Sequence, residues 1–203
     1  MNYILFENEK IYPSKVVCVG RNYVEHIKEL GNEMPQNMVL FNKPNSAISN
    51  KLFYFKDEIR YEAEISFLIK NKKIYAVGFG LDLTDAKIQN YLKEKSLPWE
   101  RAKAFDYSAV FGKFIKIKEE DLKKLQMKLF INKELKQYAK YDLMIYKPKE
   151  ILEEILSFMS LEDGDIIMSG TPKGVGGYKR GDLFEGKIYI EDKEILSSSF
   201  LVK

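Results

Sequence analysis

Short apolar stretches separated by polar turns run along most of the chain, and those typical of strands outnumber those typical of helices. In "RYEAEISFLIK", residues 60–70, apolar side chains occupy every second position from Tyr61 to Ile69, which is the period of a β-strand. By this criterion, or by short continuous apolar blocks, strands are predicted within residues 1–13, 15–19, 38–44, 61–69, 75–84, 111–117, 127–135, 164–177 and 186–203.

Helical periodicity is weaker and predicts three helices. The first is expected to begin at Asn22, whose side chain can cap it with Glu25 at the capping-box position, and to end near Gly31. Two more are expected within residues 85–95 and 147–160, the latter with an apolar stripe. Because these helices interrupt the strands without a βαβ rhythm, the pattern predicts a strand-rich α+β fold rather than a doubly wound sheet.

Composition limits the class of protein further. The 203 residues suffice for one domain, and we expect a short N-terminal segment (1–15) followed by a single domain (16–203). A net charge of +3 with both signs mixed gives no reason to expect nucleic acid or an anionic membrane as the main partner. The apolar runs are too short to span a bilayer, the N-terminus does not resemble a signal peptide, and the single cysteine, Cys18, excludes an internal disulfide. These features predict a cytoplasmic protein.

Two glutamates interrupt the apolar pattern of the strand at residues 61–69. Glu62 and Glu64 point to one face, where like charges repel each other and lose hydration if the face is covered. A solvated strand face is one explanation. The other is a site for a hard divalent cation, which carboxylate oxygens bind well. Asp82 ends the next apolar strand, and a hairpin between the two strands would bring it to the pair as a third ligand.

Two further residues are candidates for chemistry. His26, the only histidine, lies three residues before Glu29 on the predicted first helix, so the two side chains are neighbours. A carboxylate beside an imidazole fixes its tautomer and raises its basicity, as for a general base with its orienting partner. Lys103 follows the only tryptophan and lies between two alanines, and a partly covered lysine can polarise a substrate oxygen. The alternatives are an exposed charged helix and an ordinary surface lysine.

The glycine-rich segment "SGTPKGVGG", residues 169–177, resembles a phosphate-binding loop only superficially. It lacks the GxxxxGK[ST] spacing, and no helix clearly follows it. What remains is a tight turn whose free backbone N–H groups, with the hydroxyl of Thr171, can hold a carboxylate. A plain glycine turn is the alternative.

The order of these signals along the chain resembles the successive motifs of the fumarylacetoacetate hydrolase family, over nearly the whole chain after Val16. The resemblance is closest to the small single-domain branch of acylpyruvate hydrolases, oxaloacetate decarboxylases or tautomerases, and 2-hydroxyhepta-2,4-diene-1,7-dioate isomerases. The segments that carry it are "GRNYVEHIKEL", "YEAEISFLI", "GFGLDLTDAKIQ", "LPWERAKAFD" and "EDGDIIMSGTPKGVG".

The resemblance implies a mixed β-sheet roll with peripheral helices, usually a homodimer, that acts on a small 2-oxo acid with Mg²⁺ or Mn²⁺. The residues it implies are Glu62, Glu64 and Asp82 as metal ligands, His26 and Glu29 as a dyad on a mobile lid helix, Lys103 as the active-site lysine, and Arg21, Gln89, Gly170 and Thr171 as substrate contacts.

The chain departs from the family pattern just after Asp82. Many relatives carry an arginine there, in a stretch like DxTxRDxQ, whereas "DLTDAKIQ" has Ala86 at that position. Because that arginine commonly contacts the acidic part of the substrate, its loss implies a less anionic substrate or a replacement cation, for which Lys87 is the candidate. Tyr138 and Tyr141 also lie near positions where relatives often have threonine or serine.

Three activities are compatible with these residues. The first expectation is a metal-dependent hydrolase that cleaves a C–C bond in an acylpyruvate or another β-dicarbonyl 2-oxo acid through an enolate. The second is an isomerase, tautomerase or decarboxylase of 2-oxo diacids, which needs the same enolate stabilisation but no activated water. The third is a catalytically idle metal-binding dimer, against which the presence of His26, Glu29 and Lys103 argues.

Overall fold

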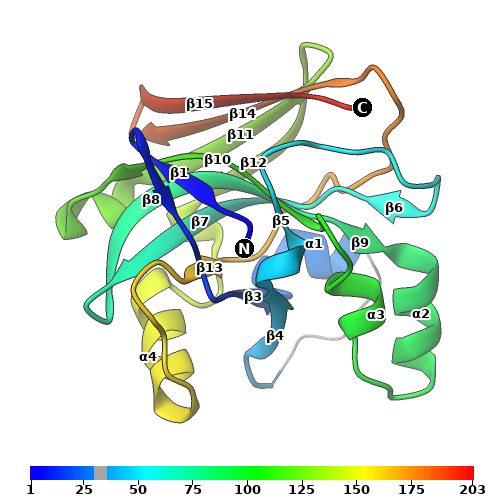
Figure 1. Ribbon diagram of the computed structural model, residues 1–203, viewed down its shortest axis with the longest axis horizontal. Coiled ribbons are helices and arrows are strands. Elements are labelled where there is room, and N and C mark those ends of the chain that lie inside the picture. The colour runs from blue at the N-terminus through cyan, green and yellow to red at the C-terminus, as the bar shows by residue number, and fades with distance from the viewer. Residues whose placement is uncertain (30–35) are drawn as a thin grey trace.

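The structure, a computed structural model, describes residues 1–29 and 36–203 of the 203-residue chain. Two β-sheets lie one above the other, and the helices lie beside the larger sheet (Figure 1). Within the two described stretches, no helix has the length and apolar character needed to cross a membrane. The strand-rich α+β class predicted from the sequence is confirmed.

The centre of the molecule is a hairpin of β7 (Ala63–Lys70) and β8 (Lys73–Asp82). Its turn residues Asn71 and Lys72 both have positive φ. Such turns have a twist that matches the twist of the paired strands. All of β7 except its last residue is buried, so the hairpin is covered on both faces.

The hairpin forms the middle of a nine-stranded sheet. Its other strands are β1 (Ile4–Phe6), β2 (Glu9–Ile11), β3 (Lys15–Gly20), β4 (Val39–Pro44), β5 (Ile48–Ser49), β10 (Ala109–Lys116) and β13 (Ile166–Met168). They run in the order β2-β1-β10-β8-β7-β13-β3-β4, with β5 paired to β10. The sheet is mixed, because β1 and β5 run parallel to β10 and β3 runs parallel to β13.

A second, antiparallel sheet covers one face of the first (Figure 1). Its strands, in the order β12-β11-β14-β15, are β11 (Leu125–Ile131), β12 (Glu134–Lys140), β14 (Leu183–Ile190) and β15 (Lys193–Leu201). Asn132 and Lys133, which both have positive φ, form the turn between β11 and β12. Phe79 of β8 packs against Phe200 of β15 with ring centroids 6.3 Å apart, which joins the two sheets in one core.

The helices are α1 (Val24–Glu29), α2 (Ala86–Glu94), α3 (Glu100–Lys103) and α4 (Pro148–Phe158), with 3₁₀ turns at Asn45–Ala47, Glu119–Lys124 and Tyr141–Leu143. The short ladder of β6 (Ile59–Arg60) and β9 (Thr84–Asp85) leads into α2, and the Asp85 carboxylate caps α2 by accepting from the N–H of Ile88 at 3.0 Å. The sequence did not predict α3, because four residues are too few to show helical periodicity.

The predicted cap of the first helix is wrong. α1 begins at Val24, and the buried side chain of Asn22 instead donates to the carbonyls of Ser169 at 2.7 Å and Tyr146 at 3.0 Å. It also accepts from the N–H of Tyr146 at 2.7 Å. Buried amide groups need such partners, and here that need outweighs the local capping pattern. Gly31, the predicted end of this helix, lies outside the described residues.

Asp165, just before β13, ties the N-terminal strands to the sheet. Its buried carboxylate pairs with Lys15 Nζ at 2.6 Å and accepts from the N–H groups of Ser14, Lys15 and Glu162 at 2.9, 3.1 and 2.9 Å. Burial alone would raise the pKa of Asp165, but the hydrogen bonds from Lys15 and Glu162 outweigh it and lower the pKa.

We therefore expect Asp165→Asn to destabilise the protein by about 1–3 kcal/mol at pH 7. A lowered native pKa gives stability that is present above the unfolded-chain pKa of about 3.9 and is lost as the pH falls through the native value. Wild type should thus lose more stability than the variant between pH 5 and 3. Urea unfolding over that range measures it, and parallel pH profiles would contradict the assignment.

Candidate active site

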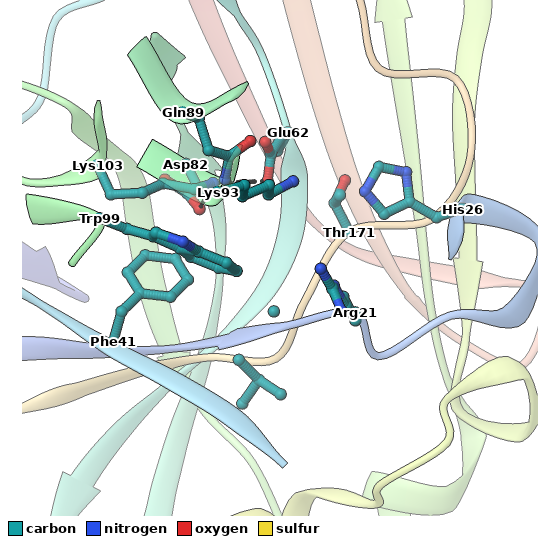
Figure 2. Close-up of a pocket in the computed structure, with 12 residues that line it drawn as sticks. Arg21, His26, Phe41, Glu62, Asp82, Gln89, Lys93, Trp99, Lys103 and Thr171 are labelled. Carbon is teal, nitrogen blue, oxygen red and sulfur yellow. Dashed lines mark hydrogen bonds and ion pairs between the residues drawn. The ribbon is translucent and has the colours of Figure 1, made fainter. Parts of the chain in front are cut away.

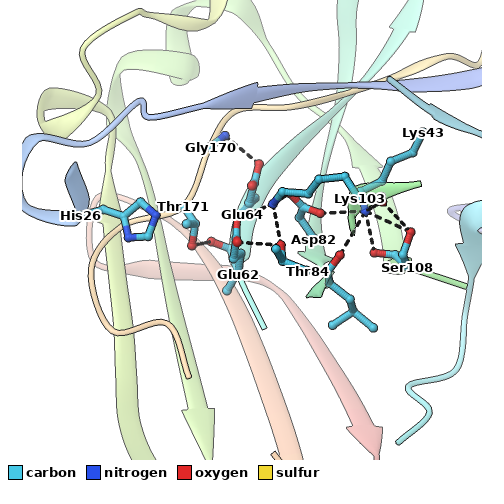
Figure 3. Close-up of polar contacts among 12 residues, drawn as sticks. His26, Lys43, Glu62, Glu64, Asp82, Thr84, Lys103, Ser108, Gly170 and Thr171 are labelled. Carbon is cyan, nitrogen blue, oxygen red and sulfur yellow. Dashed lines mark hydrogen bonds and ion pairs between the residues drawn. The ribbon is translucent and has the colours of Figure 1, made fainter. Parts of the chain in front are cut away.

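Three carboxylates meet where β7 and β8 are paired (Figure 3). The antiparallel register sets Ala63 opposite Leu81, and the N–H of Asp82 donates to the carbonyl of Glu62 at 2.8 Å. One carboxylate oxygen from each of Glu62, Glu64 and Asp82 lies within 4.8 Å of the others. The hairpin predicted to bring Asp82 to the two glutamates is therefore present, and the strand face that carries them is covered.

Two buried lysines partly neutralise this cluster. Lys103 Nζ contacts Glu62 Oε2 at 2.9 Å and Asp82 Oδ2 at 2.7 Å, while Lys43 Nζ pairs with Asp82 Oδ1 at 2.8 Å. Burial would lower the pKa of Lys103, but Asp82 and Glu62 outweigh burial and raise it, so the amine is held as a cation. Glu62 has a lowered pKa, because Lys103, His26 and Thr84 together outweigh its burial.

Glu64 is the carboxylate of the three for which the described residues show no lysine partner. It is only 1% exposed, and it accepts from the N–H of Gly170 at 2.6 Å. Burial, then the nearby charges of Asp82 and Glu62, raise the pKa of Glu64 well above its usual range. Gly170 has a φ of +94°, and an added Cβ would lie 2.7 Å from the Cβ of Asn22, so glycine is required there.

The donor set fits a hard divalent cation. Three converging carboxylates carry one more negative charge than Lys43 and Lys103 neutralise, and the excess is concentrated at Glu64. Mg²⁺ and Mn²⁺ prefer oxygen ligands of this kind. Glu62, Glu64 and Asp82 are thus the described residues that would hold such an ion.

His26, the histidine of the dyad predicted at the first helix, lies across the cavity from Glu62 and Asp82 (Figure 2). His26 is 6% exposed, and its Nδ1 lies 3.2 Å from Glu29 Oε2. Glu29 is held in turn by the backbone N–H of Gly174, which donates to its two carboxylate oxygens at 3.0 and 3.2 Å. With Nδ1 facing Glu29, Nε2 is the histidine nitrogen left for chemistry.

The cavity between these groups is narrow and mostly polar. The residues that line it are Val19, Gly20, Arg21, His26, Phe41, Glu62, Asp82, Gln89, Lys93, Trp99, Lys103 and Thr171 (Figure 2). Most of the predicted catalytic and substrate-binding residues are therefore gathered around one space, although they come from segments far apart in the chain.

The glycine-rich turn differs from its prediction. The N–H groups of Gly170 and Gly174 are not free for a ligand, since they donate to Glu64 and Glu29. The Thr171 hydroxyl lines the cavity, but it donates to the carbonyl of Ala63 at 2.9 Å. This segment therefore positions the site's own carboxylates, and only Thr171 reaches the cavity.

The structure does not bring Lys87 to the site. Its side chain is exposed on α2, and Lys87 is not among the residues that line the cavity. Lys93 lines the cavity instead, and sequence reasoning missed it together with Lys43. A helical period of 3.6 would have placed Lys93 one turn after Gln89. The signal for Lys43 is a lone lysine at the end of the apolar strand β4.

The comparisons with known proteins agree with this geometry. The sequence model of the fumarylacetoacetate (FAA) hydrolase C-terminal domain matches residues 15–199, so the chain belongs to this family of enzymes. The chain is 34% identical to the mitochondrial oxaloacetate tautomerase oaa1 of Schizosaccharomyces pombe, over 93% of this chain and 95% of that protein.

Two solved structures extend the likeness to the fold. A candidate fumarylacetoacetate isomerase/hydrolase from Oleispira antarctica is 32% identical, with a TM-score of 0.92 over the full length of both chains. Fumarylpyruvate hydrolase from Pseudomonas aeruginosa, solved in complex with Mn²⁺ and pyruvate, is 26% identical, with a TM-score of 0.87 over 98% of this chain and 94% of that one.

Proposed function

We propose that this protein is a divalent-metal-dependent enzyme that stabilises the enolate of a small 2-oxo acid, and that keto–enol tautomerisation of oxaloacetate is its reaction. The observation that carries the proposal is the cluster of Glu62, Glu64 and Asp82 beside Lys103 at one cavity. From the sequence alone, C–C hydrolysis is the first expectation. Tautomerisation now comes before it because oaa1, a relative matched over nearly the whole chain, is an oxaloacetate tautomerase.

Each residue has a role in this chemistry. A bound Mg²⁺ or Mn²⁺ would act as a Lewis acid toward the 2-oxo oxygen, and Glu62, Glu64 and Asp82 would hold it. The cationic Lys103 adds positive charge where the enolate oxygen develops. The C3–H electron pair becomes the C2=C3 bond, water carries away the C3 proton, and the C2=O π pair moves to the 2-oxygen, which then receives a proton.

Metal dependence tests the proposal directly. We would follow the enol absorbance of oxaloacetate with metal-stripped protein, and then add Mg²⁺ or Mn²⁺, with the same metal in protein-free buffer as the control. We expect protein-dependent acceleration only after metal is added. Conversion at the protein-free rate, with Mn²⁺ shown to be bound, would reject the proposal.

Hydrolysis of an acylpyruvate is the second candidate, because His26 lines the cavity and Glu29 contacts its Nδ1, as in a water-activating dyad. In His26→Ala, hydrolysis of acetylpyruvate or fumarylpyruvate should fall by roughly 10²–10⁴-fold, the usual contribution of a general base. Tautomerisation should fall less than about tenfold, since it needs no activated water. Rates of both reactions on one preparation decide between them, and an equal loss would put His26 in the tautomerisation step.

A further inference from the structure

One wall of the cavity carries a cation that has no part in the carboxylate cluster. Lys93 lies near the end of α2, and its half-buried side chain points into the same space as that of Arg21 (Figure 2). Its Nζ lies 5.4 Å from the ring centroid of Trp99, which also lines the cavity. The amine is therefore held against the aromatic wall by its stem and by the ring.

Lys93 differs in its partners from the other two lysines of the site. Lys43 and Lys103 are each paired with a carboxylate, whereas no ion pair of Lys93 occurs among the described residues. Glu62, the nearby acid that favours the charged amine, has its two oxygens engaged by Thr84 at 2.7 Å and Lys103 at 2.9 Å.

The surroundings of Lys93 are unfavourable to its charge. Burial, followed by the positive charge of Arg21, lowers the pKa of Lys93. A partly desolvated amine that lines a narrow cavity is stabilised by an anion bound beside it. The carboxylates of the metal cluster are already engaged by Lys43, Lys103 and the N–H of Gly170.

The helix presents Lys93 to the cavity and directs Lys87 elsewhere. At 100° per residue, Lys93 follows Gln89 by one turn and Ala86 by two, so the three share one face. Gln89 and Lys93 both line the cavity from this face. Lys87 projects from another side, where it is exposed.

We propose that Lys93 is a specificity-determining residue that binds the second, distal carboxylate of a 2-oxo dicarboxylate. This inference rests on the proposed function, in which the 2-oxo group would lie at the cation that Glu62, Glu64 and Asp82 would hold. It predicts that the enzyme distinguishes small dicarboxylates from their monocarboxylate counterparts mainly through Lys93, with Arg21 as the neighbouring cation.

A matched pair of unreactive ligands tests this by calorimetry. Malate and lactate share a 2-hydroxy acid group, and malate adds one distal carboxylate. With Mn²⁺-loaded protein, Lys93→Gln should weaken malate binding on the order of 10- to 100-fold, as for a lost charge-assisted hydrogen bond, and change lactate binding less than about twofold. Lys93→Arg should keep the preference for malate, and Lys95→Gln, an exposed lysine after the same helix, is the control.

The possible results distinguish a failure of this inference from a failure of the proposed function. The assignment to Lys93 would be overturned if Lys93→Gln lost affinity for malate and lactate equally, or lost none for either. It would also be overturned if wild type showed no preference for malate, or if Lys87→Gln instead lost affinity for malate alone. A wild type that binds no Mn²⁺ or does not accelerate oxaloacetate tautomerisation refutes the proposed function. An active, Mn²⁺-bound wild type with an unchanged malate preference in Lys93→Gln refutes this inference alone.

Discussion

Replacing Glu64 with glutamine is expected to reduce metal-dependent turnover on the order of a thousandfold, because Lewis-acid stabilisation of an enolate is worth several kcal/mol. Glutamine keeps the size of the side chain and an oxygen that can accept from the N–H of Gly170. It removes only the charge that the described lysines leave uncompensated. The affinity for Mn²⁺ should fall with the turnover, which calorimetric titration of both proteins measures.

The same substitution should stabilise the protein when no metal is bound. The pKa of Glu64 is raised by burial and by Asp82 and Glu62, so the native state holds the proton more tightly than the unfolded chain does. Metal-free wild type therefore loses stability as the pH rises from the unfolded-chain value of about 4.3 through the raised native pKa. Metal-free Glu64→Gln lacks this loss and should be more stable at pH 7.5, on the order of 1–3 kcal/mol.

A lower affinity for Mn²⁺ together with a higher stability of the metal-free protein distinguishes a metal ligand from a merely structural acid. Thermal unfolding in the presence of a chelator should show a higher Tm for Glu64→Gln, and adding Mn²⁺ should raise the Tm of wild type alone. Glu120→Gln, at an exposed glutamate, should change neither quantity. A Glu64→Gln protein that binds Mn²⁺ as wild type does would remove Glu64 from the metal site.

The sequence predicted the centre of the site because the information there is local. The alternation around Glu62 and Glu64, the polar turn after β7 and the apolar strand ending in Asp82 lie within about twenty residues. Period-two strands joined by a tight turn have few ways to pair, and the register follows from which face is buried. His26 and Glu29 are likewise neighbours on one helix, and their contact needs no tertiary information.

What the sequence could not supply are contacts between distant segments. Gly174 holds Glu29 across 145 positions of the chain, and Asn22 leaves its expected capping position for carbonyls more than 120 positions away. Local patterns favour a cap and a free glycine turn, but burial requires each polar group to find the partner that the fold places beside it. The roles of these residues in catalysis stay predictions until the variants are measured.

Lys43→Met is expected to destabilise the protein by about 3–5 kcal/mol, the usual cost of removing one partner of a buried ion pair. Lys43 is 0% exposed, and its Nζ pairs with Asp82 Oδ1 at 2.8 Å. It also donates to the carbonyls of Leu83, Lys103 and Ser108. Methionine matches the length of the side chain, so the loss would come from the charge and its hydrogen bonds rather than from a cavity.

Denaturant unfolding measures this effect, and Lys187→Met provides the matched control. Lys187 pairs with Glu194 at 3.0 Å, but at the surface, where such a pair contributes at most about 1 kcal/mol. If Lys43→Met lost no more stability than Lys187→Met, the negative charge of Asp82 would be compensated by Lys103 alone.

Replacing Lys43 with methionine should also weaken the binding of Mn²⁺. Asp82 is held between Lys43 on one oxygen and Lys103 on the other, so the two amines fix the plane of its carboxylate. Without Lys43 the carboxylate is free to rotate about its remaining partner, and a ligand held in one orientation binds a cation more tightly than one that must be ordered. Mn²⁺ affinity in the folded fraction of Lys43→Met should therefore fall by roughly 10–100-fold, the range found for residues that orient metal ligands. An unchanged affinity beside a large loss of stability would show that Lys43 supports the fold without orienting Asp82.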